Sequence, residues 1–165
     1  MENFLLAYKD KFYRFALRMT GDSNDAEDIM QELAIKIWKK GEEFEKIENK
    51  EAWCMAVTRN LSIDKIRKNK TREHSNIEDA YKVSTDMRSP EKQMESDDIM
   101  TKIKKLIASM PENYKTVIQL REIEEMTYKE IAEIMNIDLH KVKVYIFRAR
   151  KMLQQLIIDA NLKTI

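Results

Sequence analysis

Glycine and proline are nearly absent from this sequence, which has two of each in 165 residues. Tight turns between antiparallel strands need such residues every few positions, so their scarcity argues against a β-rich fold and favours long helices. The hydrophobic fraction of 43% is sufficient for packed cores. The breaks in helical spacing coincide with Gly21, Gly41, Pro90 and Pro111. We therefore predict an all-α protein.

Three helical patterns precede residue 70, each with apolar residues at spacings of three and four. Asn24 and Glu27 have the spacing of a capping box, so the second helix is expected to begin there. Residues 42–50 are irregular and are expected to form a loop. The apolar stripe of the second helix is expected to contain Ala26, Ile29, Met30, Leu33, Ile37 and Trp38.

Helical periodicity stops between about Thr71 and Glu95, where the chain is polar and its apolar residues are scattered. Such a composition is typical of a linker. The sequence therefore predicts two small helical domains, at residues 1–72 and 96–165, joined by a flexible linker over residues 73–95.

The second predicted domain contains a helix-turn-helix pattern. Thr127 and Glu130 form a capping box before a short helix, and Asp138 is a good N-cap for the helix after the turn. The outer face of that last helix carries no acid from Lys141 to Lys151, whereas a merely solvated helix usually mixes Glu with Lys. This pattern favours a helix that enters the major groove of DNA over a plain helical hairpin. The predicted contact residues are Lys141, Lys143, Val144, Phe147, Arg148 and Lys151.

Charge in the first predicted domain is divided between two segments. Six basic residues lie between Arg59 and Arg72, which is more than a helix dipole needs and suits a phosphate-binding surface. The second helix instead begins with acids, which suit its dipole or an acidic surface for a basic protein partner.

Three segments resemble the extracytoplasmic-function sigma factors. Residues 25–32 are similar to the family's core-polymerase-binding motif, and Ala52-Trp53 with residues 58–67 is similar to its minus-ten recognition helices. Motifs scattered over residues 110–150 resemble its minus-thirty-five domain. The match spans nearly the whole chain outside the linker.

The resemblance implies a factor that binds core RNA polymerase, through the clamp helices of the largest subunit, and directs promoter-specific initiation. It implies recognition of the minus-thirty-five element as duplex and of the minus-ten element as melted strand, whose extruded base enters the loop from Phe44 to Asn49. It also implies an anti-sigma partner, no cofactor and no catalysis. The implied polymerase contacts are Asp25, Glu27, Asp28, Ile29, Met30, Gln31 and Glu32. The implied minus-ten contacts are Phe44, Asn49, Trp53, Arg59, Asn60, Lys65, Arg67 and Lys68.

One departure from the family concerns the promoter sequence that is read. Many members carry a Gly-Thr pair and then Ser-Arg in the turn and early recognition helix, where this chain has His140-Lys141 and Val144-Tyr145. The fold tolerates the change, because none of these positions needs a positive φ once Asp138 caps the helix.

Other protein classes fit less well. A helix-turn-helix regulator that acts without polymerase is the main alternative, and a helical adaptor would leave the basic surfaces unexplained. An enzyme is disfavoured, because His74 and His140 have no partner spacing and Cys54 sits in an apolar stretch as a core thiol. One cysteine, no signal-peptide pattern and no apolar run near 20 residues predict a cytoplasmic protein without membrane insertion.

Overall fold

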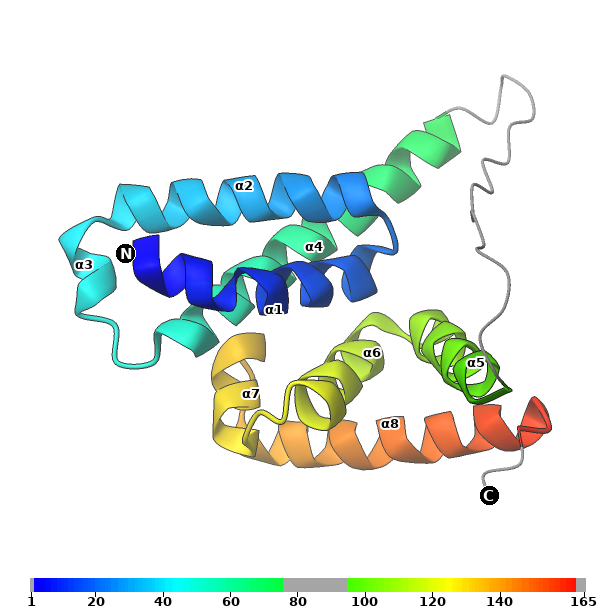
Figure 1. Ribbon diagram of the computed structural model, residues 1–165. Helices are drawn as coiled ribbons and strands as arrows, with labels where there is room; N and C mark the ends of the chain where they lie inside the picture. The colour runs from blue at the N-terminus through cyan, green and yellow to red at the C-terminus, as the bar shows by residue number, and fades with distance from the viewer. Residues whose placement is uncertain (1, 76–94, 163–165) are drawn as a thin grey trace.

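The computed structural model describes residues 2–75 and 95–162, and regular structure within those ranges is entirely helical (Figure 1). This confirms the all-α prediction. In chain order the elements are α1 (Glu2–Thr20), α2 (Ser23–Lys40), α3 (Glu42–Glu45), α4 (Lys50–Ser75), α5 (Glu95–Ser109), α6 (Glu112–Ile118), the π-helical turn η1 (Gln119–Ile123), α7 (Tyr128–Met135) and α8 (Leu139–Asp159).

The first half is built from α1, α2 and α4, which pack on one another. Gly21 adopts φ +74°, a conformation that costs glycine little, and this lets the chain reverse after α1. Asp22 then caps α2, since its extended backbone places the side chain to accept a hydrogen bond from Asp25 N. The predicted capping box at Asn24 and Glu27 is therefore wrong.

Residues 42–50 are not a continuous loop. Gly41, at φ +56°, ends α2 and its N–H donates to the Trp38 carbonyl, after which Glu42–Glu45 form the short helix α3. The apolar Phe44 of this helix is fully buried, which anchors the segment on the first half. The following helix, α4, continues to Ser75, beyond the point where apolar periodicity ends, and most of the predicted linker lies outside the described residues.

The second half contains the predicted helix-turn-helix. Thr127 Oγ1 accepts from Glu130 N while the Glu130 carboxylate accepts from Thr127 N, so the predicted capping box of α7 is confirmed. Asn136 ends α7 in the left-handed conformation, at φ +52°. Asp138 caps α8 through a 2.8 Å hydrogen bond from Lys141 N, which confirms that prediction too.

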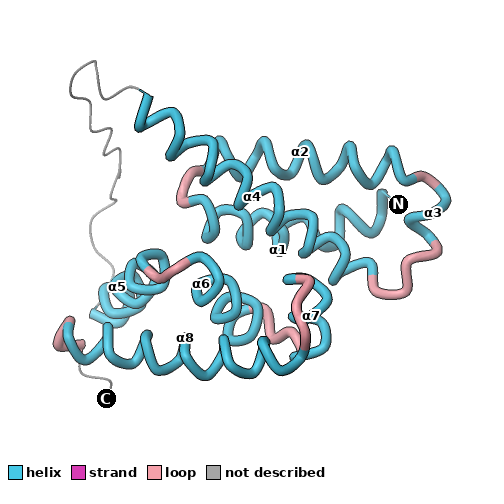
Figure 2. The backbone as a smooth tube through the Cα atoms, turned by 180° about the vertical axis from the view of Figure 1, so that it is seen from behind, coloured by secondary structure: helices cyan, strands magenta, loops and turns pink. Residues whose placement is uncertain are grey.

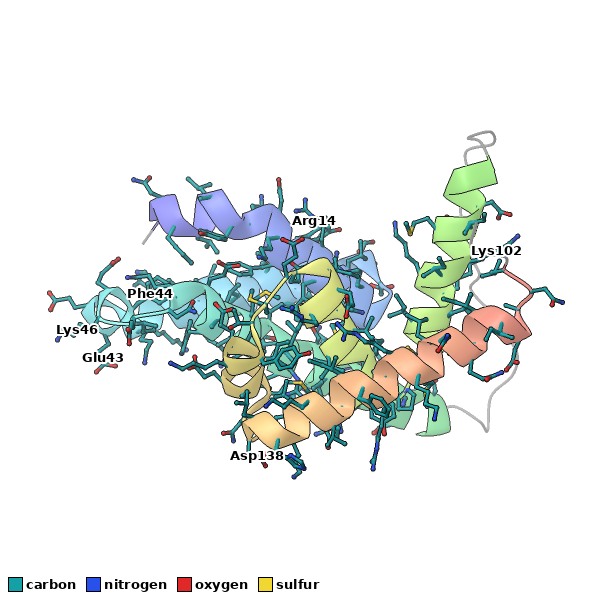
Figure 3. All side chains as sticks on the ribbon, turned by 90° about the horizontal axis from the view of Figure 1, so that it is seen from below. Arg14, Glu43, Phe44, Lys46, Lys102 and Asp138 are labelled. Carbon is teal, nitrogen blue, oxygen red and sulfur yellow. The ribbon has the colours of Figure 1, made fainter. Side chains whose placement is uncertain are left out.

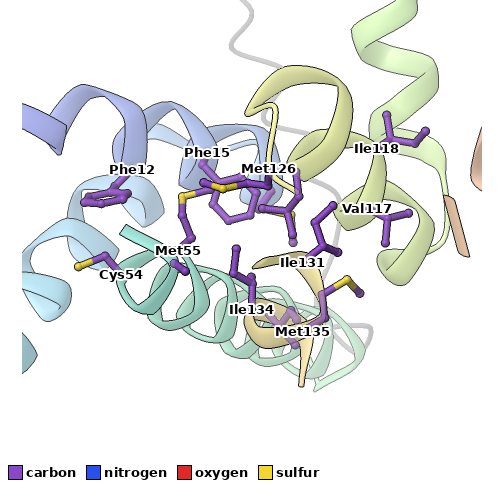
Figure 4. Packing of buried hydrophobic residues seen from close by; sticks show 14 of the residues in the cluster. Phe12, Phe15, Cys54, Met55, Val117, Ile118, Met126, Ile131, Ile134 and Met135 are labelled. Atoms are coloured by element: carbon purple, nitrogen blue, oxygen red, sulfur yellow. The ribbon is translucent and has the colours of Figure 1, made fainter. Parts of the chain in front are cut away.

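The two halves share one apolar core. Phe12, Phe15 and Met55 of the first half belong to the same buried cluster as Met126 and Ile131 of the second (Figure 4). Helix α7 packs on α4, as the view from behind also shows (Figure 2). The sequence did not predict this placement of the halves.

Candidate nucleic-acid interface

Helix α8 separates an apolar face from a basic one. Val142, Ile146 and Ala149 are buried against the rest of the second half. The opposite face is exposed along the helix, whose N-cap Asp138 lies at the edge of the molecule (Figure 3). The hydrogen bond from Lys141 N holds the pKa of Asp138 below its ordinary value. A charged N-cap therefore fixes the start of this helix.

The predicted duplex contacts lie together on that exposed face. Phe147 is 67% exposed, which is unusual for a phenylalanine and leaves its ring available to a partner. Arg150 turns aside, because its Nε atom donates to Glu122 at 2.8 Å. Of the predicted contacts, Val144 is half-buried, and Lys141, Lys143, Phe147, Arg148 and Lys151 are exposed.

The residues predicted to hold an extruded base occupy different environments. Phe44 is fully buried, with its ring edge-to-face on Trp53 at 5.6 Å between centroids. Phe44 therefore belongs to the core in this arrangement and offers no surface to DNA. Asn49 caps α4, as its Oδ1 accepts from Ala52 N, and its Nδ2 donates to Glu130 of α7 at 3.0 Å. Trp53 remains half-buried beside a groove of about 610 Å³ between the start of α4 and α7.

The basic segment of α4 is also divided. Asn60, Arg67 and Lys68 are exposed, whereas Arg59 is half-buried and burial lowers its pKa. Lys65 donates to the Asp28 carboxylate at 2.8 Å, and this hydrogen bond raises the pKa of Lys65. The predicted strand-binding residues thus do not form one continuous open surface.

Helix α2 presents the predicted polymerase contacts on its outward side. Glu27, Asp28, Gln31 and Glu32 are exposed, while Asp25 and Met30 are half-buried. Ile29 is fully buried between α2 and its neighbours, so its side chain packs the core.

Two exposed apolar residues of α2 were not predicted as surface residues. Trp38 is 76% exposed, so its assignment to the apolar stripe is wrong, and Ile35 is 50% exposed. Both continue the face of Asp28 and Gln31, at helical spacings of three and four. This spacing could have been recognised in the sequence, and it places Ile35 and Trp38 on the outward face of α2.

The described residues contain no group of three or more His, Cys, Asp and Glu side chains that could hold a metal ion. Cys54 is fully buried, and burial raises the pKa of its thiol to about 12, so it is an inert core residue. Among the described helices, none is both long and apolar enough to cross a membrane.

Comparison with known proteins covers both halves. The family model described as Sigma-70 region 2 matches residues 4–72, and the model described as Sigma-70, region 4 matches residues 100–153. ECF RNA polymerase sigma factor SigW of Bacillus subtilis is 34% identical over 160 residues, which cover 92% of this chain and 86% of SigW. SigM of the same organism is 33% identical over 152 residues, 90% of each chain.

The fold is also similar to that of a solved sigma factor. RpoE of Bartonella quintana, solved in complex with the anti-sigma factor NepR, superposes with a TM-score of 0.74. The two chains are 24% identical, and the match covers 94% of this chain and 95% of RpoE.

Both family models match this chain, and region 2 precedes region 4 along it. The chain therefore belongs to the sigma-70 family of RNA polymerase sigma factors. Its relatives place it in the extracytoplasmic-function subfamily. The protein is thus a polymerase-binding factor for promoter-specific initiation and not an enzyme, and a regulator that acts without polymerase is not favoured.

Proposed function

We propose that three faces of this sigma factor divide the work of initiation. The outward face of α2, around Asp28 and Gln31, docks on the clamp helices of the largest polymerase subunit. The basic face of α8 binds the minus-thirty-five element as duplex. The face of α4 around Asn60, with Arg67 and Lys68, binds the minus-ten element once its strands have separated.

The observation that carries this proposal is the sign and exposure of the α8 face. Positive residues stand on one side of a helix-turn-helix, with no acid among them from Lys141 to Lys151. Such a face neutralises phosphates, and the helix fits the width of a major groove. The exposed Phe147 at its centre suits apolar contact with a thymine methyl group.

The proposal also includes a cytoplasmic location and an anti-sigma factor as a further partner. The lone, buried Cys54 has no need of an oxidising environment, which supports a cytoplasmic location. The similar RpoE structure was solved with an anti-sigma factor, which supports an anti-sigma partner for this chain too. We also propose that residues 1–72 and 96–165 act as two functional domains and that residues 73–95 link them.

Removal of the α2 contacts tests polymerase docking. The double variant Asp28→Ala with Gln31→Ala should reduce retention of core polymerase in a pull-down by about tenfold or more, since central interface residues dominate affinity. The matched control is Gln155→Ala with Asp159→Ala, which removes an exposed Gln–Asp pair at the end of α8. The same proteins are then compared in run-off transcription from genomic fragments. Equal retention by both variants would refute the assignment of α2.

A further inference from the structure

Arg59 of α4 is only partly available to a bound strand. Its side chain is half-buried, burial lowers its pKa, and its Nε atom is buried without a hydrogen-bond partner among the described residues. An arginine that binds a phosphate usually presents two N–H groups of its planar guanidinium side by side. Because Nε is enclosed, one of the two edges that could bind a phosphate in this way is closed.

Another part of the guanidinium group is bonded to the next residue. Arg59 Nη1 donates a hydrogen bond to Asn60 Oδ1 at 3.2 Å. Adjacent side chains of a helix do not face each other, so this contact needs a side chain as long as arginine. Both residues belong to α4, and the contact therefore does not require the second half of the chain.

This hydrogen bond determines which end of the Asn60 amide faces outward. An asparagine amide has an acceptor at its oxygen and two donors at its nitrogen, whereas arginine has donors alone. Arg59 can therefore pair only with the oxygen, and the planar amide then holds its NH2 group on the other side. Since Asn60 is exposed, the NH2 group is the end that it offers to a partner.

The orientation of this amide matters for a single strand. An unpaired base offers both donors and acceptors on its edges, and an asparagine that rotates freely can pair with either kind. An asparagine whose oxygen is occupied by a cation is left mainly with its two donors. Arg59 thus restricts Asn60 to acceptors, such as the carbonyl oxygens and ring nitrogens of the bases.

We infer that Arg59 is a positioning residue, which acts on the separated strand through Asn60 rather than by a phosphate contact of its own. It holds the Asn60 amide so that the NH2 group donates to an acceptor on a base. The inference rests on the proposed strand-binding function of α4. It changes the role of Arg59, which the resemblance implies is a direct contact, and it assigns the chemistry that Asn60 recognises.

Holoenzyme binding to a forked promoter DNA tests this role, because such a DNA presents the minus-ten strand already separated. Asn60→Ala should weaken binding about tenfold, since one hydrogen bond to a base is lost. Arg59→Met keeps a long apolar stem and should weaken binding about fivefold, because the released amide turns its oxygen to the strand in a fraction of the molecules. Arg59→Lys keeps a charged donor and should recover part of that loss.

The double variant Arg59→Met with Asn60→Ala separates positioning from direct contact. If Arg59 acts through Asn60, the double variant should bind within about twofold of Asn60→Ala alone, and Arg59→Met should keep the salt dependence of the parent. Losses that multiply to about fiftyfold, or a salt slope reduced by about one, would overturn the inference in favour of a phosphate contact. Arg14→Met, which removes an exposed arginine of α1, is the control for net charge. Far-UV circular dichroism checks that each variant is folded.

The acceptor is tested from the DNA side. Each base of the separated strand is replaced in turn by an abasic site, and the base that Asn60 contacts is the one whose removal costs nothing further in Asn60→Ala. At that position an analogue without the acceptor should weaken binding of the parent about tenfold, whereas an analogue without the donor should bind normally. The reverse result would refute the orientation of the amide. Equal binding by Asn60→Ala and the parent would instead refute the strand-binding role of Asn60 in the proposed function, and the inference would fall with it.

Discussion

The two proposed DNA-binding surfaces differ in what surrounds them. The basic face of α8 is open, and its apolar side is packed within its own half. The basic face of α4 is partly covered, with Asn49 bonded to Glu130 and Arg67 beside Glu112. A duplex is present before any strand separates, so an open duplex-binding surface and a covered strand-binding surface match the order of events at a promoter.

This difference between the α4 and α8 surfaces also indicates at which of them access to DNA can be regulated. A surface formed by one helix on its own core is available in every arrangement of the halves. A surface covered by another part of the chain is available only in a fraction of the molecules, and that fraction responds to whatever binds the covering half. At Asn49 and Arg67 the α4 face therefore depends on where the second half lies, whereas the α8 face does not.

The largest effect on this comparison is expected at the open surface. Arg148→Ala should weaken formation of the closed promoter complex by about 1–3 kcal/mol if the side chain contacts a base edge. Filter binding of holoenzyme to duplex promoter fragments measures this step. The control is Arg14→Ala, an exposed arginine of α1. Equal losses for the two variants would show that only overall charge matters.

A smaller effect is expected at the α4 surface, and at a later step. Asn60→Ala should leave closed-complex formation nearly intact and reduce open complexes about tenfold, since one polar contact to a base is lost. Permanganate footprinting detects the separated strands. Asn3→Ala, an exposed asparagine of α1, is the control. If Asn60→Ala and Arg148→Ala impair both steps alike, the division between the two surfaces is wrong.

Local signals in the sequence predicted much of the fold. The capping box of Thr127 with Glu130 and the N-cap Asp138 were correctly predicted, because each depends on residues three positions apart. The start of α2 was misplaced, since Asp22 and Asn24 are both good caps and the positive φ of Gly21 decides between them. Trp38 was misassigned because its hydrophobicity was given more weight than its phase on the helix.

Contacts distant in sequence could not be predicted. Arg18 and Glu124 are 106 positions apart, and neither has a local pattern that marks it as a partner. The burial of Phe44 likewise depends on Phe4 and Trp53, whose rings surround it only in the folded chain. The residues of the α8 face were predictable because one helix sets their spacing, whereas the cover on α4 required the structure.

An effect of intermediate size is expected from a change in α7, the helix that packs against both α4 and α8. Thr127→Ala removes the N-cap of α7 and should lower the free energy of unfolding by about 1 kcal/mol. Urea denaturation measures the change, with Thr101→Ala in the middle of α5 as the control. Because α7 packs against both α4 and α8, the loss should affect the two surfaces equally. A loss confined to duplex binding would contradict this.

The smallest effect is expected from pH, and it should appear in the second half. Hydrogen bonds from backbone N–H groups lower the pKa of Glu130 and of Asp138 below their ordinary values of 4.5 and 3.8. A lowered pKa contributes stability that is present above the ordinary value and is lost as the pH falls through the lowered one. Hydrogen-exchange protection factors, in which the pH dependence of the intrinsic rate is divided out, should therefore fall first at the start of α7 and α8 on acidification below about pH 4. Asp138→Asn keeps a cap of similar strength that does not titrate, so exchange at the start of α8 should lose most of this pH dependence. If the variant and the parent show the same profile, Asp138 is not the group whose protonation frees the start of the recognition helix.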